Sequence, residues 1–453
     1  MHPEGKVHPS LFALGLLLCI VCLTYANGLW GVFQFDDFNV IVNNARVHSW
    51  SAWWQDVHHG IRPVLKLTYT FDWTLGLGVY GFHLGNIFIH LLNTCLVWAL
   101  SCRVVANSPL LKEHSLLPLL AALLFAVHPV QTEAVTYICG RSAALMTLFY
   151  LSGLWAYSAG RQQGNAYYLH LLTPLAMLLA LGTKETAVTF PFALLLWELY
   201  NGGSARTAAR YQWSSWLLLL VSGVFFLYHE GYSAELATSA GLNNLSGNFA
   251  TQTLAFAYLM RQWFMPLWLN IDPDLRVVHS YAGLLPQIGV LCAVIALTVL
   301  TRRRRPWLSF ALAWAVLQLF PLYIVLPRLD VANDRQLYLA SWPLALALVA
   351  ELSCWLQPRV FRLVVLSLLA VLVCLSMLRN QDYQSEIALW QATVKLSPDK
   401  ARVQNNLGYA LMLDGNIPQA RAAFTTALQL DPGYYQARYN LLTLKEKTGE
   451  TVR

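Results

Sequence analysis

Two adjacent carboxylates, Asp36 and Asp37, lie just beyond the first long apolar run of this 453-residue sequence. Their neighbours Phe35 and Phe38 are apolar. Like charge and a low dielectric raise the pKa of one acid in such a pair, and an acid with a raised pKa suits a general base. The alternative is a solvated pair that caps a helix. Asp36 and Asp37 are therefore the first candidate catalytic residues.

Further acids and cations lie at the ends of other apolar runs. Ionisable residues at membrane depth are functional candidates by default, and Arg and Lys bind phosphate as a planar fork and as a point charge. The set comprises His128, Glu133 and Arg141 between two runs, Lys184 and Glu185 between two others, Arg335 and Tyr338 at the start of a later run, and Arg62 and Arg261. Such a group could hold an anionic headgroup, although the adjacent Lys184 and Glu185 could also simply neutralise each other.

The composition indicates which elements carry these residues. The chain is 57% hydrophobic and 12% charged, about half the charged fraction of a soluble domain, so it has too little charge to coat a water-exposed surface. We attribute the net charge of +7 to loop Lys and Arg that set membrane orientation rather than to nucleic-acid binding. We therefore expect an all-α, polytopic membrane helix bundle.

The apolar runs predict the number of spans, because about 20 apolar residues cross a bilayer. The expected spans are 11–30, 83–101, 116–130, 141–159, 166–182, 187–201, 212–230, 283–301, 307–326, 337–356 and 360–378. They number about eleven. The run 252–269 is ambiguous because Arg261 lies at its middle, and a central Arg costs about 2.5–3.5 kcal/mol in the bilayer.

The cluster Arg302–Arg305 sets the expected orientation, since cytoplasmic loops are rich in Lys and Arg. With the N-terminus in the cytoplasm, this cluster is cytoplasmic only if 252–269 is a re-entrant or interfacial segment. The rival topology lets 252–269 cross and keeps the C-terminus in the cytoplasm. The favoured topology places every candidate acid and cation on the outer side of the membrane.

The chain changes character after Arg379. Residues 401–432 carry small and large apolar residues at the spacing of one tetratricopeptide repeat, with parts of a repeat on each side. Such repeats bind peptides on a concave face, or alternatively cap the membrane domain. We expect a transmembrane domain over 1–379, with a first outer loop over 31–82 that bears the acid pair, and an extracytoplasmic repeat module over 380–453.

The order of these motifs resembles the transmembrane and tetratricopeptide-repeat-containing proteins, within the GT-C glycosyltransferases that include protein O-mannosyltransferases. The matching pieces are Phe35-Asp36-Asp37, Arg62-Pro63, Gly81 to Asn93, His128 to Glu133, Gly140-Arg141, Lys184-Glu185, Asp334 to Leu339 and the repeats. The array is shorter than in animal members, and Asn333-Asp334-Arg335 stands where those members commonly show Glu-Arg. The short array favours a bacterial relative.

The resemblance implies a GT-C-type bundle that transfers a sugar from a polyprenyl- or dolichyl-phosphate donor to a protein Ser or Thr hydroxyl. Asp36 would be the base, and Asp37 would position the acceptor or the base. Donor phosphate would be bound by Arg335, Lys184 and Arg141, and also by Arg62 and Arg261. Supporting or acceptor-site residues would be His128, Glu133, Glu185 and Tyr338. A divalent metal stays open, because some relatives of this type use one.

Two other functions stay open at this point. The same chemistry could act on a lipid or glycan acceptor, or the chain could be a non-enzymatic scaffold whose repeats bind partners. The expected partners are the lipid-linked donor, membrane lipids and a protein acceptor docked on the repeats. The expected location is a bacterial cytoplasmic membrane with the repeats in the periplasm, or alternatively the endoplasmic reticulum membrane with the repeats in the lumen.

Overall fold

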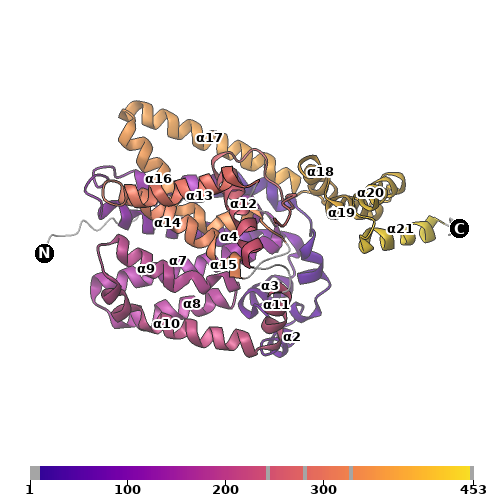
Figure 1. The fold of residues 1–453 in the computed structure, drawn as a ribbon, viewed down its shortest axis with the longest axis horizontal. Coiled ribbons are helices and arrows are strands. Elements are labelled where there is room, and N and C mark those ends of the chain that lie inside the picture. Colours follow the sequence, from indigo (N-terminus) through magenta and orange to yellow (C-terminus); the bar gives the residue numbers. More distant parts are fainter. Residues whose placement is uncertain (1–10, 241–244, 279–282, 326–329, 449–453) are drawn as a thin grey trace.

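Helices are the only regular secondary structure in the computed structural model, which describes residues 11–240, 245–278, 283–325 and 330–448. The core consists of α4 (Gly78–Ala106), α5 (Leu117–Val127), α7 (Arg141–Gln163), α14 (Pro306–Leu319) and α16 (Leu337–Trp355), which pack against one another. Because α16 is buried over most of its length, it forms the centre of this bundle (Figure 1).

The remaining membrane-domain helices surround this core. They are α1 (Leu11–Tyr25), α8 (Thr173–Leu181), α9 (Phe190–Tyr200), α10 (Ala205–Tyr228), α11 (Glu230–Ala240), α12 (Leu245–Phe264), α13 (Leu285–Thr301), α15 (Pro321–Val325) and α17 (Pro358–Asp382). Large apolar side chains such as Leu220 on α10 and Leu363 on α17 are exposed. An apolar outer face of this kind suits contact with lipid.

Five helices among the described residues are long and apolar enough to cross a membrane. They are Leu11–Trp30, Gly78–Ala106, Ala205–Tyr228, Asp334–Trp355 and Pro358–Asp382. A sixth candidate is the expected span 116–130, in which α5 is followed by a 54° bend and the segment Pro129–Val135. The expected count of about eleven is not confirmed, because apolar runs such as that of α9 form helices of only 11 residues.

Charged residues lie near both ends of α16. Near its C-terminal end, Glu351 pairs with Arg305 of the predicted cytoplasmic cluster. At the other end, the short helix η8 (Asp334–Gln336) carries Arg335. The rise of a helix places these two positions about 24 Å apart. The arginine cluster and the candidate site therefore lie toward opposite ends of the bundle.

The predicted outer loop contains short helical elements. They are η2 (Phe38–Val42), η3 (Ala45–Val47), α2 (Trp50–Asp56) and α3 (Pro63–Leu75), while η1 (Ala26–Trp30) ends the first candidate span. The Ser49 side chain caps α2 by accepting the N–H of Ala52 at 3.2 Å. Trp50 and Trp54 are exposed on this helix, which suits the membrane–water interface.

Further short turns carry the site residues on the bundle side. They are η4 (Pro129–Gln131), α6 (Thr132–Val135), η5 (Ile138–Gly140) and η7 (Glu185–Thr189), whereas η6 (Tyr168–Leu172), between α7 and α8, carries no site residue. Pro129 follows the end of α5, where proline cannot continue the hydrogen-bonding pattern of the helix. The chain therefore bends at this point, and Glu133 and Tyr137 lie in the short turns next to the outer loop.

The C-terminal module comprises α18 (Glu386–Leu396), α19 (Ala401–Leu413), α20 (Ile417–Leu430) and α21 (Tyr435–Thr448), and it projects from one end of the bundle (Figure 1). The predicted repeat is the α19–α20 pair. A Cβ at Gly408 would lie 2.7 Å from the Phe424 ring, so only glycine lets these two helices approach this closely. α17 continues through the predicted boundary at 379 and ends at Asp382.

Candidate active site

Asp37 is fully buried, with 0% of its surface exposed. Its two carboxylate oxygens accept the backbone N–H groups of Gln34 at 2.9 Å and Cys139 at 2.8 Å. Burial raises the pKa of Asp37 to about 7, although these hydrogen bonds act in the opposite direction. Asp37 therefore fastens the first outer loop to the η5 turn, more than a hundred residues away along the chain.

Asp36 is half-buried, and its surroundings differ from those of Asp37. Its backbone N–H donates to the Tyr137 hydroxyl at 3.1 Å. No hydrogen bond or ion pair to the Asp36 carboxylate is present among the described residues. A fixed backbone with a carboxylate available to a substrate suits a general base.

The backbone immediately before Asp36 is left-handed. Phe35 (φ 49°) and Arg62 (φ 56°) are the two non-glycine residues with positive φ in the described part of the chain. This conformation costs an L-residue about 1–2 kcal/mol and concentrates at functional sites. Both residues belong to motifs of the predicted site.

Arg335 lies on the other side of Tyr137. Its guanidinium is 5.8 Å from the centre of the Tyr137 ring. It pairs with Glu133 at 3.5 Å, and the Arg335 backbone N–H donates to the same carboxylate at 3.2 Å. Asp36 also acts electrostatically on Arg335. One tyrosine therefore contacts both the residue that bears the proposed base and a cation suited to bind phosphate.

Arg141 is tied to the scaffold. Only 1% of its side chain is exposed. It pairs with Asp72 at 2.5 Å, and donates to the Asn86 side chain at 2.5 Å and to the carbonyl of Phe82 at 2.8 Å. It therefore joins α3, α4 and α7 beneath the acid pair, with most of its donors already engaged.

Arg62, Lys184 and Glu185 form a second charged group. Arg62 makes two hydrogen bonds to Glu185, at 2.8 and 2.9 Å. The loop that bears Lys184 and Glu185 is held to the start of α3 because Val64 N–H donates to the carbonyl of Gly182 at 3.0 Å. Lys184 is buried, with 4% of its surface exposed. The sequence-adjacent pair therefore does not simply neutralise itself, since Glu185 binds an arginine from another element.

The other predicted site residues lie in packing contacts. The His128 ring stacks on Trp263 with centroids 5.3 Å apart, and its Nε2 lies 2.9 Å from the Trp263 carbonyl. Arg261 lies over the Trp268 ring at 4.9 Å. The Tyr338 hydroxyl lies 2.6 Å from His90 Nδ1 in the bundle core. These contacts place the three residues around the site rather than beside Asp36.

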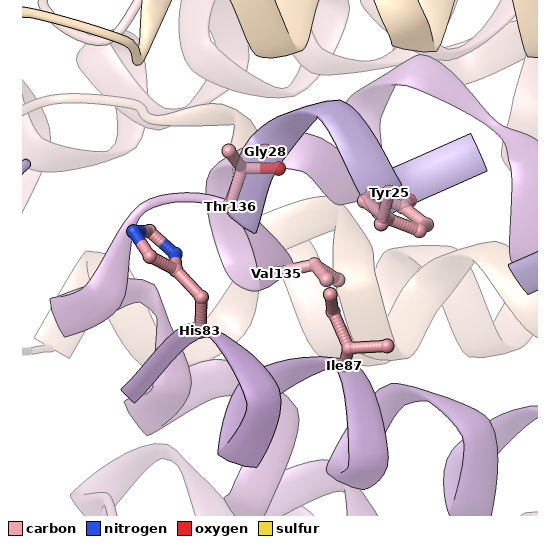
Figure 2. A pocket seen from close by; sticks show the side chains of 6 residues that line it. All are labelled: Tyr25, Gly28, His83, Ile87, Val135 and Thr136. Carbon is pink, nitrogen blue, oxygen red and sulfur yellow. The ribbon is translucent and has the colours of Figure 1, made fainter. Parts of the chain in front are cut away.

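A narrow crevice, too small to hold a water molecule, lies between the end of α1, η1, α4 and α6. Figure 2 shows its lining residues, which are Tyr25, Gly28, His83, Ile87, Val135 and Thr136. Within the described ranges, no group of three or more His, Cys, Asp or Glu side chains is arranged to hold a metal ion.

Two residues at the centre of the site were not singled out from the sequence. Tyr137 and Cys139 lie within the segment between His128 and Arg141, and they hold the backbone of Asp36 and the carboxylate of Asp37. Burial and the nearby Asp37 raise the pKa of the Cys139 thiol well above its usual range, so the thiol stays protonated. One general rule could have directed attention to such residues, because a buried carboxylate needs hydrogen-bond donors.

Comparison with known proteins supports the assignment of family. A tetratricopeptide-repeat family model matches residues 401–434. "Protein O-mannosyl-transferase F38B6.6" of Caenorhabditis elegans is 26% identical over 93% of this chain and 63% of its own length. "Protein O-mannosyl-transferase TMTC3" of Mus musculus is 25% identical over 97% of this chain and 53% of its own length. "Protein O-mannosyl-transferase TMTC1" of Homo sapiens is 26% identical, with 97% and 57% covered.

The chain is similar over nearly its whole length to members of the transmembrane and tetratricopeptide-repeat-containing family. It spans between about half and two thirds of the length of these relatives. No solved structure matches it. The predicted family is thus confirmed, as are the all-α membrane bundle and the C-terminal repeat.

The Arg141–Asp72 pair gives a prediction about stability. Arg141→Met leaves the Asp72 carboxylate buried without its cation, so we expect a loss of about 3–5 kcal/mol in the free energy of unfolding. Arg46→Met is the control. Arg46 also pairs with a buried acid, Asp56, but 64% of its side chain is exposed and Lys66 still pairs with that acid. Denaturant unfolding in detergent micelles measures both, and equal effects would contradict a structural role for Arg141.

The raised pKa of Asp37 gives a prediction about pH. The folded chain keeps a proton on Asp37 up to a pH of about 7, whereas an unfolded carboxyl loses it near a pH of about 3.9. Stability therefore falls as the pH rises from about 4 to about 7, by at most about 1.4 kcal/mol per pH unit. Asp37→Asn removes this dependence. Melting curves at several pH values test it, and a difference between wild type and variant that does not change with pH would contradict it.

Proposed function

We propose that the chain is a GT-C-type glycosyltransferase that moves a sugar from a polyprenyl- or dolichyl-phosphate donor to a protein Ser or Thr hydroxyl. The observation that carries this proposal is that Asp36, through its backbone N–H, and Arg335, through its guanidinium, both contact Tyr137. The printed names of the relatives, protein O-mannosyl-transferases, support the same reaction class.

The reaction follows from the two groups. The Asp36 carboxylate accepts the proton of the acceptor hydroxyl, and the hydroxyl oxygen attacks the anomeric carbon of the donor sugar. The bond between that carbon and the phosphate oxygen breaks, and the lipid phosphate leaves with the electron pair. Arg335 stabilises the negative charge that develops on the phosphate. The negative charge of Asp36 also stabilises the cation-like sugar centre.

The remaining predicted residues bind phosphate, orient other side chains or pack around the site in this proposal. Lys184 and Arg62 extend the phosphate-binding side, with Glu185 orienting Arg62. Glu133 orients Arg335 in the same way. Arg141 contributes through the scaffold that it makes with Asp72, and Asp37 contributes by fixing the turn that bears Asp36. His128, Arg261 and Tyr338 pack around these groups.

The side of the membrane follows from the separation of charges along the bundle. If Arg302–Arg305 lies in the cytoplasm, the opposite end of α16, with Arg335 and the acid pair, faces the extracytoplasmic side. The described part of the repeat module, which ends at residue 448, lies on that same side in this proposal, because α18 contacts the acid-bearing loop. We place the protein in a bacterial cytoplasmic membrane with periplasmic repeats, the alternative being the endoplasmic reticulum membrane with luminal repeats.

Replacement of the base tests the proposal. Asp36→Asn keeps the shape of the side chain but cannot accept the proton, so we expect transfer to fall by about 10²–10⁴-fold. Stability should change by no more than about 0.5 kcal/mol. The measurement is transfer from a polyprenyl-phosphate sugar to acceptor protein, together with intact masses of secreted and membrane proteins in cells that carry only the variant.

The control for this test is Asp399→Asn, which changes an exposed aspartate of the repeat module and should leave transfer unchanged. Wild-type activity in Asp36→Asn would remove the base from the proposal. If deletion of the gene leaves every hexose-type adduct in place, the chain acts on a lipid or glycan acceptor or serves as a scaffold.

Replacement of the phosphate-binding cation tests the other half. Arg335→Lys keeps the positive charge but loses the planar fork that binds phosphate and Glu133. Loss of a charged hydrogen bond corresponds to about 10-fold to 100-fold in transfer. Lys395→Arg, an exposed cation on α18, is the control. Unchanged kinetics in Arg335→Lys would show that the donor phosphate binds elsewhere.

A further inference from the structure

The direction of the Asp36 side chain depends on the conformation of the residue before it. Phe35 has φ 49°, in the left-handed region that phenylalanine rarely adopts. A residue in this conformation persists only where its surroundings hold it there. If Phe35 relaxed to the right-handed or extended region, the chain direction at Asp36 would change and its carboxylate would leave the site. The contacts of Phe35 are therefore part of the catalytic geometry.

Two contacts from α18 hold Phe35, beside the local hydrogen bond that its carbonyl accepts from the Phe38 N–H at 3.4 Å. The Phe35 N–H donates to Glu386 Oε1 at 3.1 Å. The Phe35 ring meets Trp390 edge to face, with centroids 5.2 Å apart at an interplanar angle of 80°. Glu386 and Trp390 are four residues apart and thus lie on one face of the helix. The helix that opens the repeat module therefore holds both the backbone and the side chain of Phe35.

Glu386 is not needed as the cap of its own helix. Ser385 already fills that role, since its hydroxyl accepts the N–H of Ala388 at 3.1 Å. An acid in the first turn is favourable for the helix dipole alone. The Glu386 oxygen nevertheless accepts a backbone N–H from a residue 351 positions away. This contact indicates a role outside α18.

The other end of α18 is fastened on the Arg335 side of the site. The Ser397 hydroxyl accepts from the Asn270 side chain at 2.8 Å and donates to the carbonyl of Asp272 at 3.1 Å. The backbone N–H of Asn270 donates to Asp334, the neighbour of Arg335, at 3.1 Å. Through these contacts, α18 is connected to the segment that bears the base and to the segment that bears the cation.

A group of ion pairs near Ser397 also keeps this end of α18 in place. The Asp272 carboxylate is buried, with 3% of its side chain exposed, and it pairs with Lys400 at 2.5 Å and with Arg402. Arg402 also pairs with Asp330 at 2.5 Å. A buried acid with two cationic partners resists movement of the start of α19, and therefore of the end of α18.

We propose that α18 is a brace for the active site, in which Glu386 and Trp390 are positioning residues that hold Phe35 left-handed and thereby aim Asp36. The proposal rests on the proposed transfer reaction. The helix that begins the repeat module is then required for chemistry at the membrane domain, whatever the repeats bind.

The test compares three variants of the full-length chain. Glu386→Ala removes the acceptor for the Phe35 N–H, and a misplaced reacting group costs up to about 100-fold in rate, so kcat should fall by about 10-fold to 100-fold. KM for the polyprenyl-phosphate sugar should stay unchanged, because Arg335 still binds the phosphate. Glu386→Gln keeps a carbonyl acceptor and should restore kcat. Gln391→Ala, on the exposed face of α18, should match wild type.

Trp390→Phe and Trp390→Ala extend the test to the ring contact. Phenylalanine keeps an aromatic face for Phe35 and should keep most of kcat, whereas alanine should lower kcat at constant KM. Melting temperatures of all variants are measured alongside. A fall in kcat that only follows a loss of folded protein, or an equal fall in Glu386→Gln and Glu386→Ala, would overturn the brace.

The outcome for the brace is separable from that for the reaction. If Asp36→Asn is inactive while Glu386→Ala has wild-type kcat, the brace is wrong and the reaction stands. If Asp36→Asn is as active as wild type, the proposed reaction itself is wrong, and the brace fails with it.

Discussion

The buried carboxylate of Asp37 imposes the constraint on which the site depends. Taking a carboxyl group out of water is costly unless its oxygens find donors, and here the donors are the backbone N–H groups of Gln34 and Cys139. The hydrogen bond from Cys139 holds the acid-bearing loop against the turn before α7, and the bond from Gln34 is local to the loop. That turn also supplies Tyr137, which binds the backbone of Asp36. Asp37, the neighbour of the proposed base Asp36, therefore holds the backbone of the site in place.

The helix bundle also places charged residues at both of its ends. Arg141 and Arg335 stand at one end of long helices, and Arg161 and Arg305 stand at the other, each paired with a buried or half-buried acid. Pairing lowers the cost of holding a cation at membrane depth. The arginines nevertheless differ in how available they are to a ligand. Arg141 is enclosed, whereas Arg335 contacts Tyr137, the residue that also binds the backbone of Asp36.

The sequence predicted much of this arrangement because composition and spacing are local properties. The acid pair beyond the first apolar helix and the repeat around Gly408 both appear where expected. It could not predict that Asp37 would be buried while Asp36 stays available, because that depends on donors a hundred residues away. Nor could it give the number of spans, because apolar runs also form short buried helices. The roles of the site residues stay predictions.

The most direct measurement is a structure of the full-length chain with a polyprenyl-phosphate sugar analogue that cannot be cleaved. We expect the phosphate to contact the Arg335 guanidinium, and the anomeric carbon to face the Asp36 carboxylate with room for a hydroxyl between them. A phosphate bound away from Arg335, or an Asp36 carboxylate directed away from the sugar, would contradict the account.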